Sequence, residues 1–156
     1  MDARVKELAA AISGAVDPFS SSDHRLLYAH EIIAKTQWPG LAVEDSWIAE
    51  SEFGEGDLGA LRDALISYAE RHRDHPSRSA AYWGLGALMD RGDLGLFRRF
   101  LLAECQRSDP DAHAIWQLMV ALDNIGESIL GDASSVLDPS VLTEARRYLN
   151  SLGLLQ

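Results

Sequence analysis

Carboxylates and aromatic side chains are concentrated in one stretch of the sequence, residues 37–56, which contains no lysine or arginine. Its acidic residues are Glu44, Asp45, Glu50, Glu52 and Glu55, and its aromatic residues are Trp38, Trp47 and Phe53. Aromatic side chains anchor apolar groups of a binding partner, and carboxylates attract basic groups. This acidic aromatic insert is therefore a candidate protein-binding surface.

The same composition also allows a purely structural interpretation. A connection this long in a compact domain is either functional or contains a short element of its own. Trp47 and Ile48 would then lie in a short helix that fixes the insert on the core, with the acids merely solvated. We expect part of each: at least one tryptophan is structural, and the acidic side chains stay available to a partner.

The histidines raise the question of a metal site. His72 and His75 lie three residues apart, and His24 and His30 lie near Glu31. Zinc sites need three or four ligands of matching geometry, and three arginines close to the first pair (Arg71, Arg73 and Arg78) would oppose a cation. Histidine near the end of a helix is also favoured by the helix dipole. We predict no metal and no cofactor.

Nucleophilic and phosphate-binding motifs are also missing from the sequence. The one cysteine, Cys105, lies in an apolar helical pattern typical of a buried, inert thiol. No glycine-rich phosphate loop, nucleophile elbow or metal-hydrolase helix motif is present. Gly84 and Gly86 fall inside a helical pattern, where we expect them to permit close packing, against Tyr82 or Trp116. The chain is expected not to be an enzyme.

Charge restricts the class of partner. The 156 residues include 14 Lys and Arg against 24 Asp and Glu, a net charge of −10. Such a field repels nucleic acid, whose binding depends on basic side chains, and favours basic proteins. No apolar stretch approaches the roughly 20 residues that cross a membrane, and residues 1–7 lack a signal-peptide core. We expect a cytoplasmic protein that binds neither membrane nor nucleic acid.

Apolar residues recur at helical spacing in seven segments, and these would position the candidate sites. The predicted helices cover about 2–16, 22–36, 57–73, 76–90, 93–107, 110–129 and 139–152. Helix starts are expected at His75-Pro76, Asp109-Pro110 and Asp138-Pro139, and helix ends at Gly92, Gly126 and Gly153. The sequence therefore predicts a single all-α domain over residues 1–156.

An internal repeat connects four of these helices. The segment 57–65, DLGALRDAL, returns as 93–101, DLGLFRRFL. Further along, matched pairs are Pro76 and Pro110, Ala80 and Ala114, Tyr82 and Trp116, Ala87-Leu88 and Ala121-Leu122, and Gly92 and Gly126. This indicates two copies of a helix-turn-helix, 57–92 and 93–126. A diverged unit at 2–36 and a capping helix at 139–152 would flank them.

These repeats resemble HEAT-like (armadillo-like) helical repeats. The features that carry the resemblance are Asp109-Pro110, the terminal Gly92 and Gly126, and the alanine stripe Ala80, Ala87, Ala114 and Ala121. Tetratricopeptide repeats have a similar period, but their Trp-x-x-Leu-Gly-x-x-Tyr signature is absent. The resemblance implies a short α-solenoid, a right-handed stack of antiparallel helical hairpins.

A solenoid of this kind implies a binding role. Outward positions of its inner helices would add Arg78, Tyr82, His113, Trp116 and Gln117 to the insert as partner-binding residues. Size and acidity are similar to immunity proteins that neutralise bacterial toxins, several families of which look HEAT-like, and a basic toxin would be the natural partner. The alternatives are an adaptor or regulatory subunit of a larger complex, or a HEAT-like lyase or glycosylase. The last is disfavoured because helical-repeat glycosylases are typically basic.

Overall fold

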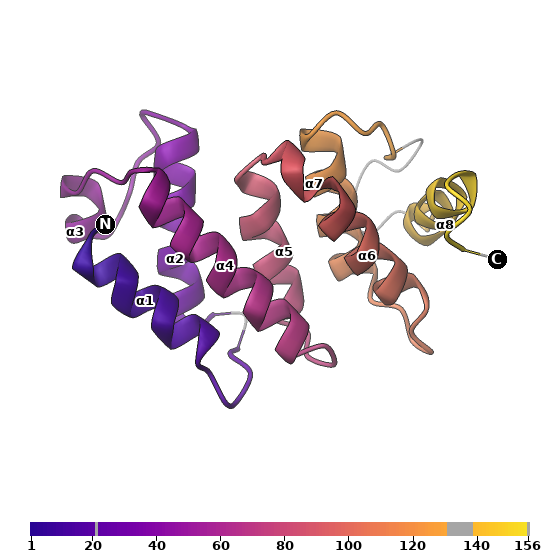
Figure 1. Cartoon of the computed structure of the whole chain (residues 1–156), viewed down its shortest axis with the longest axis horizontal. Helices are drawn as coiled ribbons and strands as arrows, with labels where there is room; N and C mark the ends of the chain where they lie inside the picture. Colours follow the sequence, from indigo (N-terminus) through magenta and orange to yellow (C-terminus); the bar gives the residue numbers. More distant parts are fainter. Residues whose placement is uncertain (21, 131–138, 156) are drawn as a thin grey trace. The chain divides into compact units, whose positions relative to one another are not determined.

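A computed structural model describes residues 1–20, 22–130 and 139–155, and in this part of the chain all regular structure is helical. The helices are α1 (Ala3–Ser13), α2 (His24–Gln37), α3 (Ser46–Glu50), α4 (Glu55–Arg71), α5 (Arg78–Ala87), the 3-10 helix η1 (Arg91–Asp93), α6 (Leu94–Cys105), α7 (Ala112–Asn124) and α8 (Val141–Ser151) (Figure 1). The all-α prediction is confirmed. The seven predicted helices occur in order, α3 lies where a short helix was expected at Trp47 and Ile48, and η1 is additional.

The chain forms two compact units, Met1–Leu88 and Met89–Gln156. The boundary lies near the end of the first predicted repeat, 57–92. The expectation of one repeat domain, and of hairpins stacked as a solenoid, stays a prediction. Each unit is therefore described by itself. None of the helices in the described part of the chain combines the length and apolar character needed to span a membrane.

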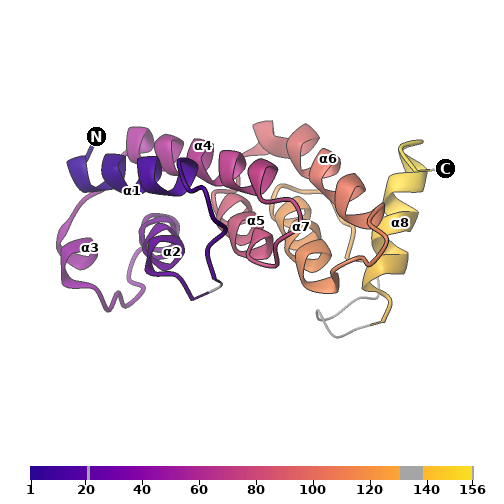
Figure 2. The same ribbon diagram turned by 90° about the horizontal axis from the view of Figure 1, so that it is seen from below.

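The first unit is a two-layered bundle. Helix α1 packs along α4, and α2 packs along α5, so that Figure 2 shows α1 and α4 in one layer and α2 and α5 in the other. Between them lie fully buried side chains from all four helices, namely Val5, Ile12, Leu26, Ile33, Leu61, Leu65, Tyr68 and Leu85. Their three- and four-residue spacing gives each helix one apolar face, and burying these faces drives the packing.

Gly84 sets how closely α5 approaches its neighbours. A Cβ atom at this position would lie 2.7 Å from Leu65 Cδ1 and 3.6 Å from His30 Cδ2. Glycine therefore lets α5 pack tightly against α4 and α2, as expected of this residue. The neighbours differ from the expected Tyr82 and Trp116.

The second unit is built on α6, α7 and α8, each of which packs against the other two. Its core includes Phe97, Leu101, Ile115, Leu118 and Leu122. A polar network ties the loop after α7 to α6 and α8: Arg98 donates to the Tyr148 hydroxyl at 2.8 Å and to Glu127 at 3.1 Å, and Tyr148 donates to Glu127 at 2.9 Å.

Helix starts lie two residues later than the proline signals predicted. Helix α7 is capped by Asp111, whose carboxylate accepts from His113 N at 2.9 Å, so Asp109-Pro110 belongs to the preceding turn. Ser77 and Ser140 occupy the N-cap positions of α5 and α8. Asp138 lies outside the described residues. In each case the proline shapes the turn before the helix, and the first helical position is occupied by another residue.

Two of the three predicted glycine helix ends are confirmed. Gly126 and Gly153 have φ values of 99° and 72°, in the left-handed region that follows many helices. Gly92 does not end a helix: it lies within η1, where its N–H donates to Asp90. The left-handed residue after α5 is instead Met89, with a φ of 54°.

Matched positions of the predicted repeats have similar environments. Asp57 and Asp93 are both buried acids at a helix start, and Leu61 and Leu65 are as fully buried as Phe97 and Leu101. This similarity is what a repeated helix pair requires. The HEAT-like assignment itself stays a prediction.

Candidate functional site: the acidic insert

The insert is held by a short helix of its own. In α3, the Asp45 carboxylate caps the first turn by accepting from Trp47 N at 3.1 Å, and Ser51 Oγ donates to Trp47 O at 2.5 Å. Ile48 is fully buried, and α3 packs against α2. The expected short helix that fixes the insert to the core is confirmed.

Lys35 on α2 binds the C-terminal end of α3. Its ammonium donates to the carbonyl oxygens of Ile48 and Ala49, both at 2.8 Å, and of Ser51. These carbonyls lie at or just beyond the C-terminal end of α3, which is the negative end of the helix dipole. The ammonium also lies 5.6 Å from the centre of the Phe53 ring. The sequence carries no local signal for this role, because Lys35 contacts carbonyls 13 to 16 residues further along the chain.

Trp47 is the structural tryptophan of the insert. Its ring meets Tyr28 and Phe53 edge to face, at centroid distances of 6.1 and 6.2 Å. The guanidinium of Arg4 lies over the same ring, 4.9 Å from its centre. Trp47 and Phe53 are half-buried. The aromatic cluster therefore joins the insert to α1 and α2. The first role of Trp47 and Phe53 is to pack the insert against these helices.

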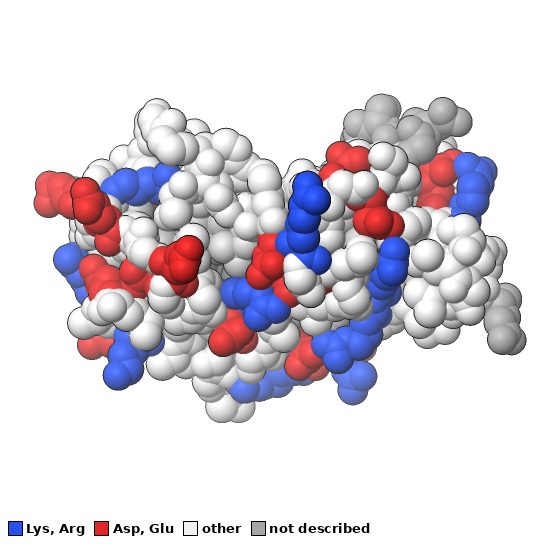
Figure 3. All heavy atoms as spheres, turned by 45° about the horizontal axis from the view of Figure 1, so that its top comes forward, with Lys and Arg blue, Asp and Glu red and all other residues white. Residues whose placement is uncertain are grey.

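The acidic side chains divide into two groups. Glu44, Glu50, Glu52 and Glu55 are exposed, and Figure 3 shows acidic side chains, with some basic ones between them, around the end of the unit that carries α3. Asp45 is partly buried as the α3 cap. Asp57, just beyond the insert, is buried and accepts from Gly54 N at 2.9 Å and from Asp2 N at 2.8 Å. The exposed four are available to a partner, and the two aspartates are structural.

Glu31, on α2 beside the insert, was not among the predicted binding residues. Burial of its carboxyl, together with the nearby charges of Asp45 and Glu44, raises its pKa above the usual value. Its Oε2 atom is buried and has no hydrogen-bond partner among the described residues. A cation brought to this place by a partner would lower that pKa and favour the charged carboxylate.

Two of the predicted helix-surface residues are not on the surface. Arg78 and Tyr82 are only 4% and 2% exposed, so the expectation that they point outward is wrong. They share one face of α5 with the buried Ala81 and Leu85, because residues three and four apart lie on the same side of a helix. Arg78 donates to His75 O at 2.8 Å.

The remaining three residues of that prediction lie on α7, in the second unit. His113 is exposed, Trp116 and Gln117 are half-exposed, and the Gln117 amide lies 3.3 Å from His113 Nε2. They form a small polar and aromatic patch separate in sequence from the insert. Their role as binding residues stays a prediction.

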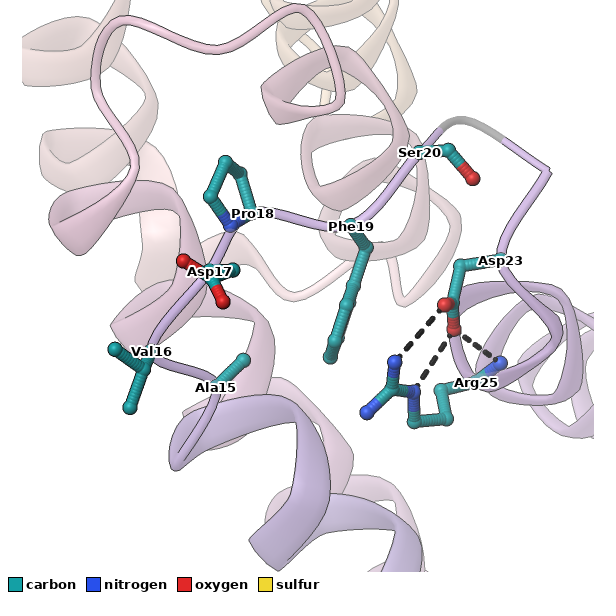
Figure 4. Close-up of a pocket in the computed structure, with 8 residues that line it drawn as sticks. All are labelled: Ala15, Val16, Asp17, Pro18, Phe19, Ser20, Asp23 and Arg25. Atoms are coloured by element: carbon teal, nitrogen blue, oxygen red, sulfur yellow. Dashed lines mark hydrogen bonds and ion pairs between the residues drawn. The ribbon is translucent and has the colours of Figure 1, made fainter.

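Two hollows of the first unit share Pro18 in their lining. The smaller, about 310 Å³, is lined by the α1–α2 connection, and Figure 4 shows that its Arg25 is already paired with Asp23 through two contacts of 3.0 Å. The guanidinium also lies 3.8 Å from the centre of the Phe19 ring. The positive charge that lines this hollow is thus already paired within the protein.

The larger hollow, about 400 Å³, is lined by Arg71, His72, Arg73, Asp74 and His75 with Pro18. His72 Nε2 lies 3.2 Å from Ala15 O, and His75 Nδ1 lies 2.8 Å from Ser77 Oγ. Ser77 is only 1% exposed, which keeps this serine–histidine pair away from a substrate. Within the described residues, no three His, Cys, Asp or Glu side chains are arranged to hold a metal ion.

Comparison with protein-family models, curated proteins and solved structures gives no match.

Proposed function

We propose that this chain is a protein-binding module whose acidic insert docks on a basic partner, and that it acts as an immunity protein that neutralises a toxin. The distribution of charge supports this. Residues 37–56 carry five acidic and no basic side chains, whereas the rest of residues 1–88 carry nine acidic and eight basic ones. An acidity that served only solubility would be spread over the surface instead.

The insert also presents its charges on a fixed frame. Helix α3 is capped by Asp45 at one end and by Lys35 at the other, and Ile48 is buried beneath it. The exposed Glu44 and Glu50 therefore project from a backbone that is already ordered. Preorganisation of this kind reduces the entropy that a complex would otherwise lose.

A basic toxin that acts on nucleic acid suits such a surface. Its active face must attract phosphates, so the same face would attract a row of carboxylates and associate with it rapidly. Binding there would cover the toxin's substrate site. The exposed Glu50, Glu52 and Glu55 provide that row in this proposal.

The test is a charge substitution with a matched control. The partner is captured from the native host by cross-linking and purified, and its association rate with two quadruple variants is measured by stopped-flow fluorescence at low salt. One variant replaces Glu44, Glu50, Glu52 and Glu55 by Gln. The other makes the same change of net charge at exposed acids elsewhere, Glu7→Gln, Asp17→Asn, Asp109→Asn and Asp123→Asn.

We expect the insert variant to associate about tenfold more slowly and the control to change less than about twofold. Equal slowing of both variants would contradict a specific role of the insert. A growth assay of cells that produce the partner then distinguishes an immunity protein from an adaptor or regulatory subunit. Restored growth when this chain is also produced supports immunity. Tight binding without rescue supports an adaptor or regulatory subunit.

A further inference from the structure

Residues Trp38 to Leu41 form a tight turn at the start of the insert. Trp38 ends α2, where its N–H donates to Ala34 O at 2.8 Å, and Leu41 N donates to Trp38 O at 3.1 Å to close the turn. Pro39 fixes φ near −65°, and Gly40 has a φ of 94°. This combination is a type II β-turn, which requires a positive φ at its third residue.

The turn exposes two large apolar side chains. Trp38 is 40% and Leu41 is 52% exposed, although both belong to a short, hydrogen-bonded segment. Among the described residues the Trp38 ring takes part in no aromatic or cation contact, in contrast to Trp47, which has three. Exposing this much apolar surface gives the folded chain no benefit, which points to a partner.

The chemistry of that partner follows from the surroundings of the turn. Glu44 is exposed three residues after Leu41, and both Glu44 and Asp45 lie close enough to Glu31 for their charges to act on its carboxyl. An exposed indole in a segment with five acidic and no basic side chains matches an apolar pocket with a rim of Lys and Arg. Tryptophan is also among the residues that most often dominate binding energy, because it buries a large area with little loss of freedom.

We propose that the Trp38–Leu41 turn is the anchor of the interface and inserts into an apolar pocket, rimmed by basic groups, on the partner protein. This rests on the proposed function, because it places the anchor within the acidic insert. Proline and glycine hold the two side chains in position before binding, so little order has to be gained in the complex.

Three variants distinguish the contribution of the Trp38 side chain from that of the backbone conformation at Gly40. Trp38→Ala removes the anchor. Gly40→Ala keeps both apolar side chains but disfavours the positive φ, and its Cβ would meet no atom within 4 Å, so the effect is confined to the turn. Gly40→Asn is the rescue, because asparagine tolerates this conformation. Leu27→Ala, at a leucine of α2 that is 41% exposed, is the control.

The probe is a phage-displayed library of random peptides, selected on the full-length protein. We expect enrichment of peptides that combine Lys or Arg with aromatic or aliphatic residues. Titration of these peptides should show an affinity loss of about thirtyfold for Trp38→Ala and about tenfold for Gly40→Ala. Gly40→Asn and Leu27→Ala should stay within about threefold of the parent.

The possible outcomes separate the two proposals. Basic peptides that bind Trp38→Ala as well as the parent would overturn the anchor and leave the acidic insert as a binding surface. Selection of acidic peptides, or of none, would overturn both. Circular dichroism melting of each variant checks the fold, and the same four titrations with the captured partner must give the same order of affinities.

Discussion

At the scale of single residues, His30 is a half-buried polar side chain that connects two helices. Its Nε2–H donates to Ala80 O at 2.8 Å, and its ring lies 4.5 Å from that of Trp83 on α5. Burial lowers the pKa of His30 below the ordinary 6.5, and the hydrogen bond to Ala80 opposes this only in part. The folded protein therefore keeps His30 neutral at pH values where the unfolded chain protonates it.

This shift predicts a pH dependence of stability. Above pH 6.5 His30 is neutral in both states, whereas below it the unfolded chain binds a proton that the folded chain does not. The free energy of unfolding should therefore fall as the pH drops from 6.5, by up to about 1.4 kcal/mol per unit from this residue. Urea titrations at pH 7 and pH 5 should show a smaller difference for His30→Gln. His24→Gln, at an exposed histidine, should behave like the parent.

Tyr68 is fully buried, and its hydroxyl joins three segments. It accepts from Phe19 N at 2.8 Å and bonds Ser77 Oγ, while its ring stacks on Phe19. Tyr68→Phe should lower the free energy of unfolding by about 1–3 kcal/mol, because the buried N–H of Phe19 loses its acceptor. Chemical denaturation measures this loss. A cost no larger than that of Tyr28→Phe, at a half-buried tyrosine, would show that the hydroxyl is dispensable.

At the scale of elements, α3 depends on support from outside its own sequence. A helix of five residues is too short to be stable alone, and the Lys35 ammonium satisfies its terminal carbonyls. The same contact connects the insert to α2. The order of the insert thus depends in part on one side chain of the neighbouring helix.

Replacing Lys35 by Met should loosen the insert. We expect a loss of about 1–3 kcal/mol, since a charged donor is removed from the half-buried carbonyls of Ile48 and Ser51. Hydrogen exchange in residues 46–53 should accelerate while α4 keeps its protection. The chain has only one other lysine, Lys6, which is exposed on α1, so Lys6→Met is the control. Unchanged exchange in Lys35→Met would contradict the clamp.

At the scale of the whole molecule, the two units differ in where their charge lies. The first unit concentrates its excess acidity in the insert, whereas the second carries six basic side chains against ten acidic ones without such a segment. The first unit also has a core drawn from four of its own helices. Both the candidate site and its supports belong to this unit.

The fragment 1–88 should therefore fold by itself. We expect a helical circular dichroism spectrum and a cooperative thermal transition, because α1, α2, α4 and α5 pack mainly on one another. The fragment should also retain the affinity of the full chain for peptides that bind the insert. A fragment without a cooperative transition would show that its core requires residues 89–156.

The sequence by itself determined the helices and the composition of the insert. Helical periodicity is local, so the seven amphipathic segments were found with errors of a few residues at their ends. The short helix at Trp47 and Ile48 was also predictable, because a long connection in a compact domain needs an internal element. The acidic excess of residues 37–56 needed no structure at all.

Only the tertiary structure decided which of these residues are exposed to solvent and which groups they contact. Arg78 and Tyr82 have polar ends and were expected outside, but their apolar bodies lie on the buried face of α5. Lys35 reaches carbonyls 13 to 16 residues away, and Asp57 binds the N–H of Asp2. Periodicity tells which face of a helix is apolar, whereas the groups that meet across the bundle are set by packing between segments far apart in the chain.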